Sequence, residues 1–396
     1  MDSVIRGSSC WPQPAQELLL HAALDEGKQA IAAWERFYQE AGLDRMEEGT
    51  FRLLPQVYRN LSRAGYSEPI MGRLKGIYRM AWCKNQVLFH EMLPVLRTLR
   101  EVGIPTMMLK GVALSLGVYR DRGARPMNDF DVLIPADAAN RALQLFDKLG
   151  WRSSMGHPMR ITPIQQRYRH AIELINPAGK AFDLHWHLLY HSRLPAADTD
   201  FWKAAWPMAL ESEPSLVLNP THQLLHTCVH GLEGNEVSSV RWVSDAIATI
   251  RAGKIDWDRL VAEARQHDLV LPIRDALQYL QDSFHAPIPR SAIWQLQADP
   301  VSRFAIMEYH RHLRPDLLQN PMVTFMATYR HYYRGVKDLP WWKQLWGYPG
   351  YVAFLLRLPS TAHLPRQFAR WIASRFRRLA VMPSASEYRS DSATQG

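Results

Sequence analysis

The stretch "RPMNDFDVLIP", Arg125 to Pro135, places Asp129 and Asp131 at the start of an apolar run. The run from Phe130 to Ile134 predicts a buried β-strand that ends at the following proline. Side chains at i and i+2 of a strand point to the same face, about 6–7 Å apart, so the two carboxylates should project together. A strand that is about to be buried does not carry two bare carboxylates unless cations meet them. The pair therefore predicts a site for hard divalent cations.

A third carboxylate lies about fifty residues downstream. Asp183 is flanked by apolar residues in "AFDLHWH", which predicts another strand, and His185 shares its face by the i+2 rule. The turn "NPAG" joins this segment to "YRHAIELIN" and indicates a β-hairpin. If the strand that carries Asp183 pairs beside the first one, its carboxylate can reach the same cations.

The tripeptide "LKG" supplies a candidate anion site, because it lies at a predicted strand-to-helix turn. Free backbone N–H groups at such a turn favour phosphate, and Gly111 permits close backbone approach. Lys110 offers a point charge and Arg125 a forked pair of donors for phosphate oxygens. Arg125 can instead neutralise Asp129 within the fold, and both interpretations stay open.

The order of predicted elements from Ile104 to about Tyr190 is strand, helix, strand, helix, strand, strand. The first hundred residues follow helical spacing, and the chain is predicted to be helical again from about Pro195. We therefore expect an α+β fold, in which a small mixed-sheet core lies between helical segments. The expected divisions are an N-terminal helical segment at 1–100, the core at 101–195, a helical acceptor-side domain at 196–330 and a basic aromatic C-terminal segment at 331–396.

Composition places the chain among ordinary globular proteins, with 396 residues, 47% of them hydrophobic and 21% charged. No apolar run is long enough to span a membrane, and the first residues lack the apolar core of a signal peptide. The three cysteines are scattered, which argues against a disulfide framework or a cysteine zinc site. We expect a cytoplasmic protein.

The net charge of +9 is concentrated near the C-terminus, where residues 331–396 hold ten Lys/Arg and three Asp/Glu. In "RQFARWIASRFRRL" the aromatic and aliphatic residues fall near one helix face and the arginines largely elsewhere. Such a helix can lie on an anionic membrane surface, so residues 331–378 predict a possible peripheral attachment. The alternative is a helix packed on the protein with a solvated basic face. No base-stacking module accompanies the charge, which argues against nucleic acid as a partner.

Two further groups in the helical region stand out. His222, His226 and His230 recur every four residues of "NPTHQLLHTCVHGL", whose N-cap is Asn219. No carboxylate or cysteine completes a zinc site at helical spacing, so helix packing or contact with a nucleotide or acceptor is the preferred interpretation. Asp245 in "RWVSDAIATI" is expected to cap or pair between helices rather than to catalyse.

These motifs together resemble the uncharacterised nucleotidyltransferase family of the polymerase-β-like nucleotidyltransferase superfamily. The resemblance rests on "LKG", on the Arg-Pro-x-x-Asp-x-Asp strand from Arg125 to Asp131, and on Asp-Leu-His-Trp from Asp183 to Trp186. It extends into "LLHTCVHG" and "RWVSDAIATI" and covers roughly residues 57–289.

The family implies Mg²⁺-dependent transfer of a nucleoside monophosphate from an NTP such as ATP to a hydroxyl acceptor, with release of pyrophosphate. Carried onto this sequence, two Mg²⁺ ions are expected at the catalytic carboxylates Asp129, Asp131 and Asp183. The expected nucleotide-binding residues are Lys110, Gly111, Arg125 and His185.

Other functions fit the same residues. The site could transfer the γ-phosphoryl group instead, as a phosphotransferase, or hold a metal and a nucleotide sugar, as a glycosyltransferase does. A non-catalytic nucleotide-binding or membrane-docking module is the alternative from a different class. The sequence leaves the acceptor open among small hydroxylated molecules, peptides, sugars and protein side chains, and it leaves the preferred base open as well.

Overall fold

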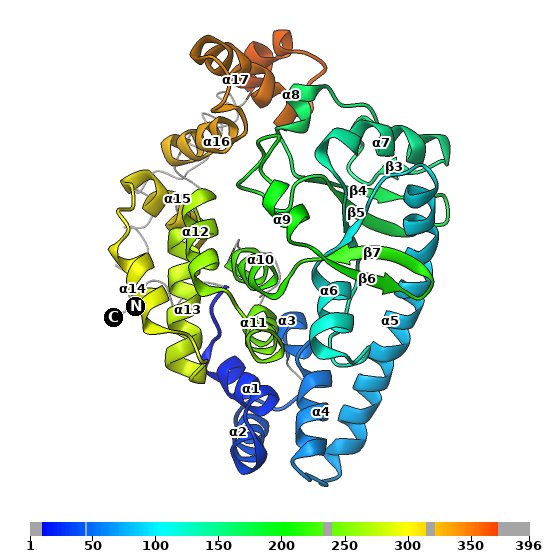
Figure 1. Cartoon of the computed structure of the whole chain (residues 1–396), viewed down its shortest axis with the longest axis vertical. Helices are drawn as coiled ribbons and strands as arrows, with labels where there is room; N and C mark the ends of the chain where they lie inside the picture. Colours follow the sequence, from blue (N-terminus) through cyan, green and yellow to red (C-terminus); the bar gives the residue numbers. More distant parts are fainter. Residues whose placement is uncertain (1–9, 44–45, 233–239, 314–320, 371–396) are drawn as a thin grey trace, which may run out of the picture. The chain divides into compact units, whose positions relative to one another are not determined.

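Helices dominate the computed structural model, which describes residues 10–43, 46–232, 240–313 and 321–370 (Figure 1). Contacts divide the chain into two compact units, Met1–Gly335 and Val336–Gly396. Within the first unit, one buried apolar cluster includes side chains from Cys10 to Tyr309, so the N-terminal helices, the sheet and the later helices share a core. The finer boundaries expected at residues 100, 195 and 330 stay predictions.

The sheet is mixed and lies in the first unit. Its strand order is β3-β4-β5-β2-β1-β7-β6, and β2 pairs in parallel with β5, as β1 does with β7, while the remaining neighbours are antiparallel. The strands are β1 (Met107–Met108), β2 (Asp131–Leu133), β3 (Arg152–Ser153), β4 (Ala171–Ile175), β5 (Ala181–His185), β6 (Trp206–Leu210) and β7 (Glu213–Val217). The expected α+β class with a mixed sheet is confirmed.

Helices precede the sheet and connect its strands. The described elements up to β5 are α1 (Pro14–Leu24), α2 (Gly27–Glu40), α3 (Glu48–Phe51), α4 (Leu54–Arg63), α5 (Ile70–Glu101), α6 (Lys110–Ala113), the π-helix η1 (Leu114–Tyr119), the 3₁₀ helix η2 (Ala136–Ala138), α7 (Ala139–Lys148) and α8 (Pro163–Gln166). The segment "GVALSLGVY" is α-helical at its start and widens into a π-helical turn, η1, after Ala113. Such turns recur at functional sites.

Helices follow the sheet as well. They are α9 (Thr199–Lys203), α10 (Pro220–Leu232), α11 (Arg241–Ala252), α12 (Trp257–Gln266), α13 (Val270–Phe284), α14 (Arg290–Ala298), α15 (Arg303–Leu313), α16 (Pro321–Val336), α17 (Trp341–Leu355) and the 3₁₀ helix η4 (Thr361–His363). The Asn219 side chain accepts a hydrogen bond from the His222 N–H at 3.1 Å, as expected of the residue that caps α10. No described helix combines the length and the apolarity that a membrane span requires.

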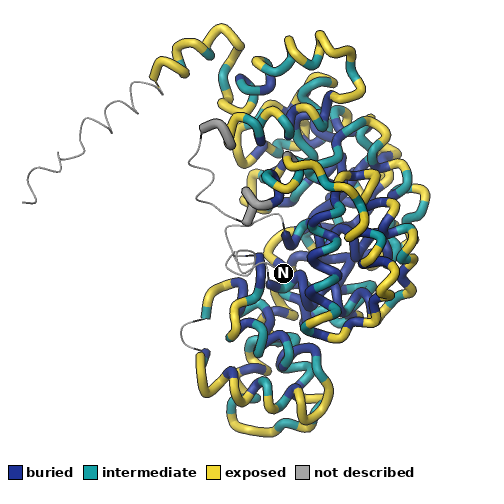
Figure 2. Tube along the Cα trace, turned by 90° about the vertical axis from the view of Figure 1, so that its left-hand side faces the viewer, coloured by how far each residue is buried: buried dark blue, intermediate teal, exposed yellow. Residues whose placement is uncertain are grey.

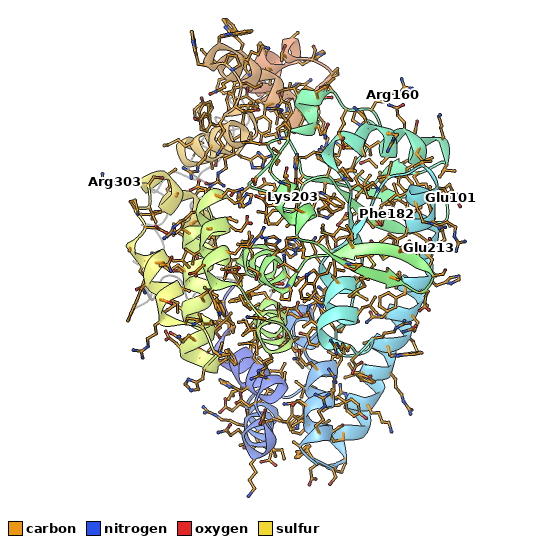
Figure 3. All side chains as sticks on the ribbon, in the orientation of Figure 1. Glu101, Arg160, Phe182, Lys203, Glu213 and Arg303 are labelled. Atoms are coloured by element: carbon orange, nitrogen blue, oxygen red, sulfur yellow. The ribbon has the colours of Figure 1, made fainter. Side chains whose placement is uncertain are left out.

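One expectation is wrong in part, because the chain after Pro195 is not continuously helical: the short helix α9 is followed by two strands. Residues 206–217 form the hairpin β6–β7, which extends the sheet beside β1. Each strand carries a proline, and the turn at Glu211 adopts a positive φ of 52° without the glycine or asparagine that usually marks it. Glu213 of β7, labelled in Figure 3, forms ion pairs with Arg97 and Arg100 of α5, and these hold the hairpin against the long helix.

The sheet separates two apolar layers, and alternation along its strands decides which side chains enter each layer. Val132 of β2 and Phe182 of β5 pack on the side of α5 and α7, where Phe182 (Figure 3) stacks on Phe130 at 5.4 Å between ring centroids. The alternate residue Leu133 packs on the opposite side, with α10 and α11. Asp131, Asp183 and His185 lie on that second side by the same alternation. Figure 2 shows the buried positions running through this interior.

Candidate active site

Two aspartates meet across the parallel strands β2 and β5. The register pairs Asp131 directly with Asp183, and Leu133 with His185. One ligand atom from each of Asp131, Asp183 and His185 lies within 4.8 Å of the others. The three side chains, which we name the acidic group, could therefore hold a metal ion. The chain therefore brings together two of the three carboxylates that the sequence singled out, and adds the predicted histidine to them.

Asp129 lies just before β2, and its side chain is exposed. It lines the same cavity as Asp131 but stands outside the group of three. It can therefore supply a further oxygen ligand from the solvent side, whereas Asp131 is almost fully buried.

Lys110 and His185 hold Asp131 in its ionised form. Its Oδ1 accepts hydrogen bonds from Lys110 Nζ at 2.6 Å and from His185 Nε2 at 2.9 Å. Burial alone would raise the pKa of Asp131, but Lys110 and His185 outweigh it and keep the pKa well below its usual range. The fold thus maintains a buried negative charge at this point.

Asp183 is in the opposite situation. Burial first, and the Asp131 carboxylate second, raise the pKa of Asp183 to about 6. The pKa of one carboxylate is lowered and that of its neighbour is raised, because the positive charge nearby neutralises only one of the two. A divalent cation would supply the missing positive charge, so the residues fit the metal that the sequence predicts.

This shift predicts a pH dependence. The folded pKa of Asp183 lies above the value of about 3.9 for an unfolded aspartate, so the group stabilises the fold below about pH 4 and loses that contribution as pH rises through 6. Mg²⁺ needs the ionised carboxylate. The increase in melting temperature that Mg²⁺ causes should therefore become larger between about pH 5 and 7.5. In Asp183→Asn the increase should not depend on pH in this range. An increase in melting temperature with Mg²⁺ that is the same at every pH would contradict the assignment.

The predicted "LKG" turn lies where β1 leads into α6. Lys110 begins α6 with a positive φ of 45°, an uncommon conformation for a residue with a side chain. A Cβ added to Gly111 would lie 2.6–2.8 Å from atoms of Met127 and Arg125. Close packing around the turn therefore favours glycine at position 111. The strained backbone of Lys110 is of a kind that is typical of functional sites.

Asp129, Asp131 and the turn line one cavity of about 280 Å³, which we name the arginine cavity. Its charged lining comes from the turn, from the residues around β2, from α11 and from Arg52 directly after α3, and α10 closes one wall with polar side chains. The members used below are Arg52, Lys110, Gly111, Arg125, Asp129, Asp131, His226, His230, Arg241 and Asp245. All sequence-predicted site residues except Asp183 and His185 line this cavity.

Arg125 does not pair with Asp129. Its guanidinium donates to the Asp245 carboxylate of α11 through Nε at 3.0 Å and Nη2 at 2.9 Å, and both side chains are buried. Tyr119 of η1 donates to the same carboxylate at 2.8 Å. Asp245 thus pairs α11 with the helix η1 through Tyr119, as expected, and also joins α11 to the β2 loop through Arg125. Because Arg125 also lines the arginine cavity, it can contact an anion there while Asp245 fixes its position.

Sequence reasoning missed two cations. Arg52 and Arg241 line the arginine cavity, and Arg241 donates to the Pro126 carbonyl at 2.7 Å. Burial, followed by the nearby Arg125 charge, lowers the pKa of Arg241 to about 9, so it stays charged at neutral pH. Three guanidiniums, those of Arg52, Arg125 and Arg241, thus line the cavity that also holds the carboxylates named above in its lining. The available signal was Arg241 itself, which begins the segment "RWVSDAIATI".

The three histidines of α10 divide into two environments. His222 is buried and contacts Glu263 of α12 at 3.2 Å, so it serves helix packing. His226 and His230 line the arginine cavity instead. Burial lowers the pKa of His226 well below its usual value, which keeps its ring neutral. His187, two residues after His185, pairs with Asp198 at 2.6 Å.

A mixed sheet that presents Asp131, Asp183 and His185 beside the "LKG" turn fits the class of nucleotidyltransferase cores. The chain belongs to the uncharacterised nucleotidyltransferase family, whose model matches residues 50–285, more than half of the chain. That range includes β1 to β7, and it includes all the residues of the acidic group and of the arginine cavity that are named above.

Among solved structures, the chain is similar to one titled "Crystal structure of an antigenic nucleotidyltransferase-like protein from Paracoccidioides brasiliensis". The two share 16% sequence identity with a TM-score of 0.34, and the match covers 53% of this chain and 95% of that chain. No curated protein matches this sequence.

Proposed function

We propose that this protein transfers the nucleoside monophosphate of an NTP to a hydroxyl acceptor in a reaction that depends on a divalent cation, with Mg²⁺ as the expected ion. The observation that carries the proposal is the pairing of Asp131 with Asp183 at one side of a cavity rich in arginine. Family membership supports the transferase class. The donor, the ion and the acceptor are the parts that the proposal adds.

The arginine cavity is the proposed site of the donor. A triphosphate carries several negative charges, and Lys110, Arg52 and Arg241 supply the opposite charge at the cavity wall. Arg125, held by Asp245, adds a fixed guanidinium. A volume of about 280 Å³ is near the lower end of the range for ligand pockets, which suits a site that binds part of the nucleotide and leaves the rest at the opening.

Asp131, Asp183 and His185 would hold the cation, with Asp129 as a further oxygen ligand. Such an ion, when bound, neutralises charge on the phosphates during displacement at phosphorus. The acceptor oxygen forms a bond to the α-phosphorus, and the bond from that phosphorus to the bridging oxygen breaks. Its electron pair leaves with pyrophosphate. The proton of the acceptor is lost, and the ionised Asp183 carboxylate is the proposed base that helps to remove it. The remaining contribution is positioning.

The experiment that tests the proposal measures which phosphate of a labelled NTP is transferred to an acceptor. The full chain is incubated with Mg²⁺, a cell extract and NTPs labelled at the α- or the γ-phosphate. We expect label from the α-position to enter an acceptor as pyrophosphate is released. Label from the γ-position alone would show a phosphotransferase. A melting temperature that rises with Mg²⁺ and sugar nucleotides but not with NTPs would favour a glycosyltransferase, and binding of NTP without any transfer would favour a nucleotide-binding module.

We also propose that the second unit attaches peripherally to anionic membranes. Helix α17 exposes large side chains, with 75% of Trp341, 78% of Trp346 and 57% of Leu345 accessible. Basic residues such as Lys343 and Arg357 lie in or directly after it. Aromatic and basic side chains on one helix suit the interface of an anionic bilayer. The segment from Trp371 onward, which the sequence argument also used, lies outside the described residues.

Sedimentation with vesicles tests this attachment. The full chain should sediment with vesicles that contain phosphatidylserine, and the double change Trp341→Ala/Trp346→Ala should lower the bound fraction at least about fivefold. Trp206→Ala is the matched control, because Trp206 is 55% exposed on β6 in the first unit. Equal sedimentation of both variants, or equal binding to neutral vesicles, would contradict the proposal.

A further inference from the structure

The β2 loop, residues 120–130, is fastened to α5 by one buried side chain. Asn85 of α5 is completely buried, and its Nδ2 donates to the backbone carbonyls of Arg122 at 2.6 Å and of Arg125 at 2.9 Å. The Met127 N–H donates to Asn85 Oδ1 at 3.0 Å. Both hydrogens of the amide nitrogen and one lone pair of its oxygen are therefore used by the backbone of this loop.

The first half of the loop is held by a different side chain. Tyr78 of α5 donates to Asp121 Oδ1 at 2.8 Å, and the same oxygen accepts from the N–H groups of Gly123 and Ala124 at 2.9 and 3.2 Å. A Cβ added to Gly123 would lie 2.7 Å from the Tyr78 ring, so this half packs directly on α5. The contacts of Asn85 are thus needed for the second half.

The second half of the loop carries residues of the arginine cavity. Arg125, Met127 and Asp129 all line that cavity. Asn85 does not line it, so any influence of Asn85 on a ligand must pass through the backbone that it holds. Loss of the Asn85 amide would leave two carbonyls and one N–H without partners in the interior, and the loop would have to move to find others.

Arg125 is fixed at both ends by different residues. Asp245 holds its guanidinium, and Asn85 holds its backbone carbonyl. A long side chain has many rotamers, and it keeps a defined position only when the backbone and the charged end are both fixed. A guanidinium that is fixed before the ligand arrives loses little freedom on binding, which favours affinity.

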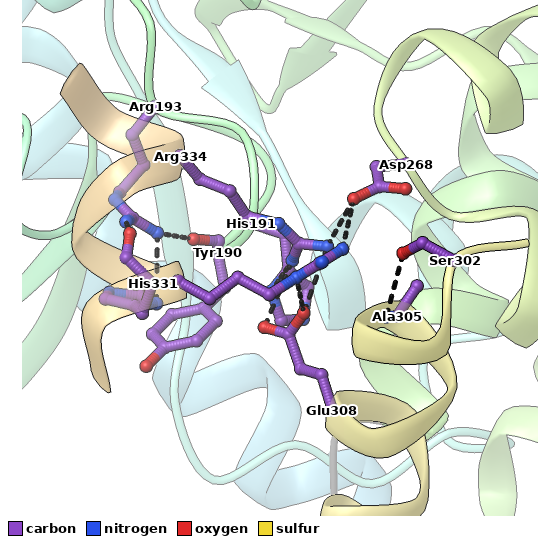
Figure 4. Close-up of polar contacts among 10 residues, drawn as sticks. Tyr190, His191, Arg193, Asp268, Ser302, Ala305, Glu308, His331 and Arg334 are labelled. Carbon is purple, nitrogen blue, oxygen red and sulfur yellow. Dashed lines mark hydrogen bonds and ion pairs between the residues drawn. The ribbon is translucent and has the colours of Figure 1, made fainter. Parts of the chain in front are cut away.

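Contacts between helices elsewhere in the first unit are of another kind. In the cluster shown in Figure 4, Arg334 of α16 forms ion pairs with Asp268 at 2.8 Å and with Glu308 of α15 at 3.2 Å. These charged side chains join one element to another, and none of the three lines the arginine cavity. Asn85 instead holds the backbone of a loop, and such a contact decides where the side chains of that loop point.

We propose that Asn85 is a positioning residue of the donor site. It holds the backbone of Arg125 and Met127 so that the Arg125 guanidinium lies where the phosphates of an NTP bind. The inference rests on the proposed function, because the arginine cavity is the proposed site of the donor. Without the Asn85 amide, the charge of Arg125 is still present but its position is not, so affinity for the nucleotide falls.

Calorimetry on the full chain tests this role with a non-hydrolysable NTP analogue and Mg²⁺. Asn85→Ala should weaken binding of the analogue about tenfold or more. Asn85→Asp has the same shape and keeps an acceptor for the Met127 N–H, but it loses at least one donor. It should therefore weaken the binding by a smaller factor, and it replaces Asn85→Ala if that variant fails to fold by circular dichroism.

Asn60→Ala is the matched control. Asn60 of α4 has the same kind of contacts, since its Nδ2 donates to the carbonyls of Ala22 at 2.9 Å and of Asp25 at 2.7 Å, and it does not line the arginine cavity. Its loss should lower the melting temperature but leave the affinity for the analogue within about twofold of the unchanged protein.

A double-mutant cycle identifies the residue through which Asn85 acts. The double change Arg125→Met/Asp245→Leu removes the guanidinium together with its buried partner. In that background Asn85→Ala, or Asn85→Asp in its place, should change the remaining affinity by less than about twofold, because the side chain that it positions is absent.

The outcomes separate this inference from the proposed function. Unchanged affinity in the Asn85 variants, a loss that Asn60→Ala shares, or an equal loss with and without Arg125 overturns the inference, while binding by the unchanged protein still supports a donor site. If the unchanged protein does not bind the analogue at all, the proposed function fails and the inference fails with it.

Discussion

Asp183→Asn is expected to lower the rate of nucleotidyl transfer on the order of 10³-fold, while the melting temperature stays the same or rises. The Asp183 carboxyl has a pKa raised to about 6 because burial and Asp131 oppose its charge. Asparagine has the same shape and carries no charge, so it removes this repulsion from the folded protein. It also removes one of the ligands that the cation requires. The rate of transfer should therefore fall, while the stability of the fold rises or stays the same.

Asp131→Asn provides the contrast within the same group. It leaves the Lys110 ammonium without its partner at 2.6 Å and weakens the bond to His185, so it should lower both the rate and the melting temperature. Asp129→Asn changes an exposed carboxylate and should abolish transfer with stability unchanged. Activity assays and thermal melts of the three variants check this pattern. A wild-type rate in Asp183→Asn or Asp129→Asn would contradict the role assigned to that residue.

Arg125→Met is expected to destabilise the protein by about 3–5 kcal/mol, because it leaves the buried Asp245 carboxylate without its main partner. The double change Arg125→Met/Asp245→Leu removes both charges and should regain most of that stability. It should not regain nucleotide affinity, since the fixed guanidinium is absent from the arginine cavity. Denaturant unfolding and calorimetry with an NTP analogue separate the two effects.

The matched control is Arg36→Met. Arg36 pairs with Glu40 on the surface at 2.8 Å, with 68% and 52% of the two side chains exposed. Solvent screens such a pair, so its loss should leave the unfolding transition unchanged. If Arg125→Met were equally harmless, the pair with Asp245 would have no part in holding the β2 loop to α11.

The sequence predicted the acidic group because its signals are local. Asp131 and Asp183 each lie in a short apolar run with turn residues near it, and alternation along a strand specifies which side chains share a face. The hairpin of residues 206–217 lacked such signals, since it contains two prolines and a turn without glycine. Its position beside β1 comes from tertiary packing, which overrides weak local preference.

The cationic part of the site could not be predicted in the same way. Arg125 and Asp245 are 120 positions apart, and Arg52 enters the arginine cavity from a region that carries no motif. Contacts of this kind depend on how helices pack against the sheet, and no spacing rule in the sequence encodes them. Lys110 and Gly111 were predictable because the turn that holds them is itself local.

The hydrogen bond from Lys110 to Asp131 has a consequence for the order of ligand association. The same ammonium cannot stay fully engaged with the carboxylate and also neutralise a triphosphate, so one partner must release it to the other. A divalent cation that takes over the charge of Asp131 frees Lys110 for the nucleotide, and a nucleotide that attracts Lys110 exposes Asp131 to the cation. By thermodynamic reciprocity, each should tighten the association of the other by the same factor.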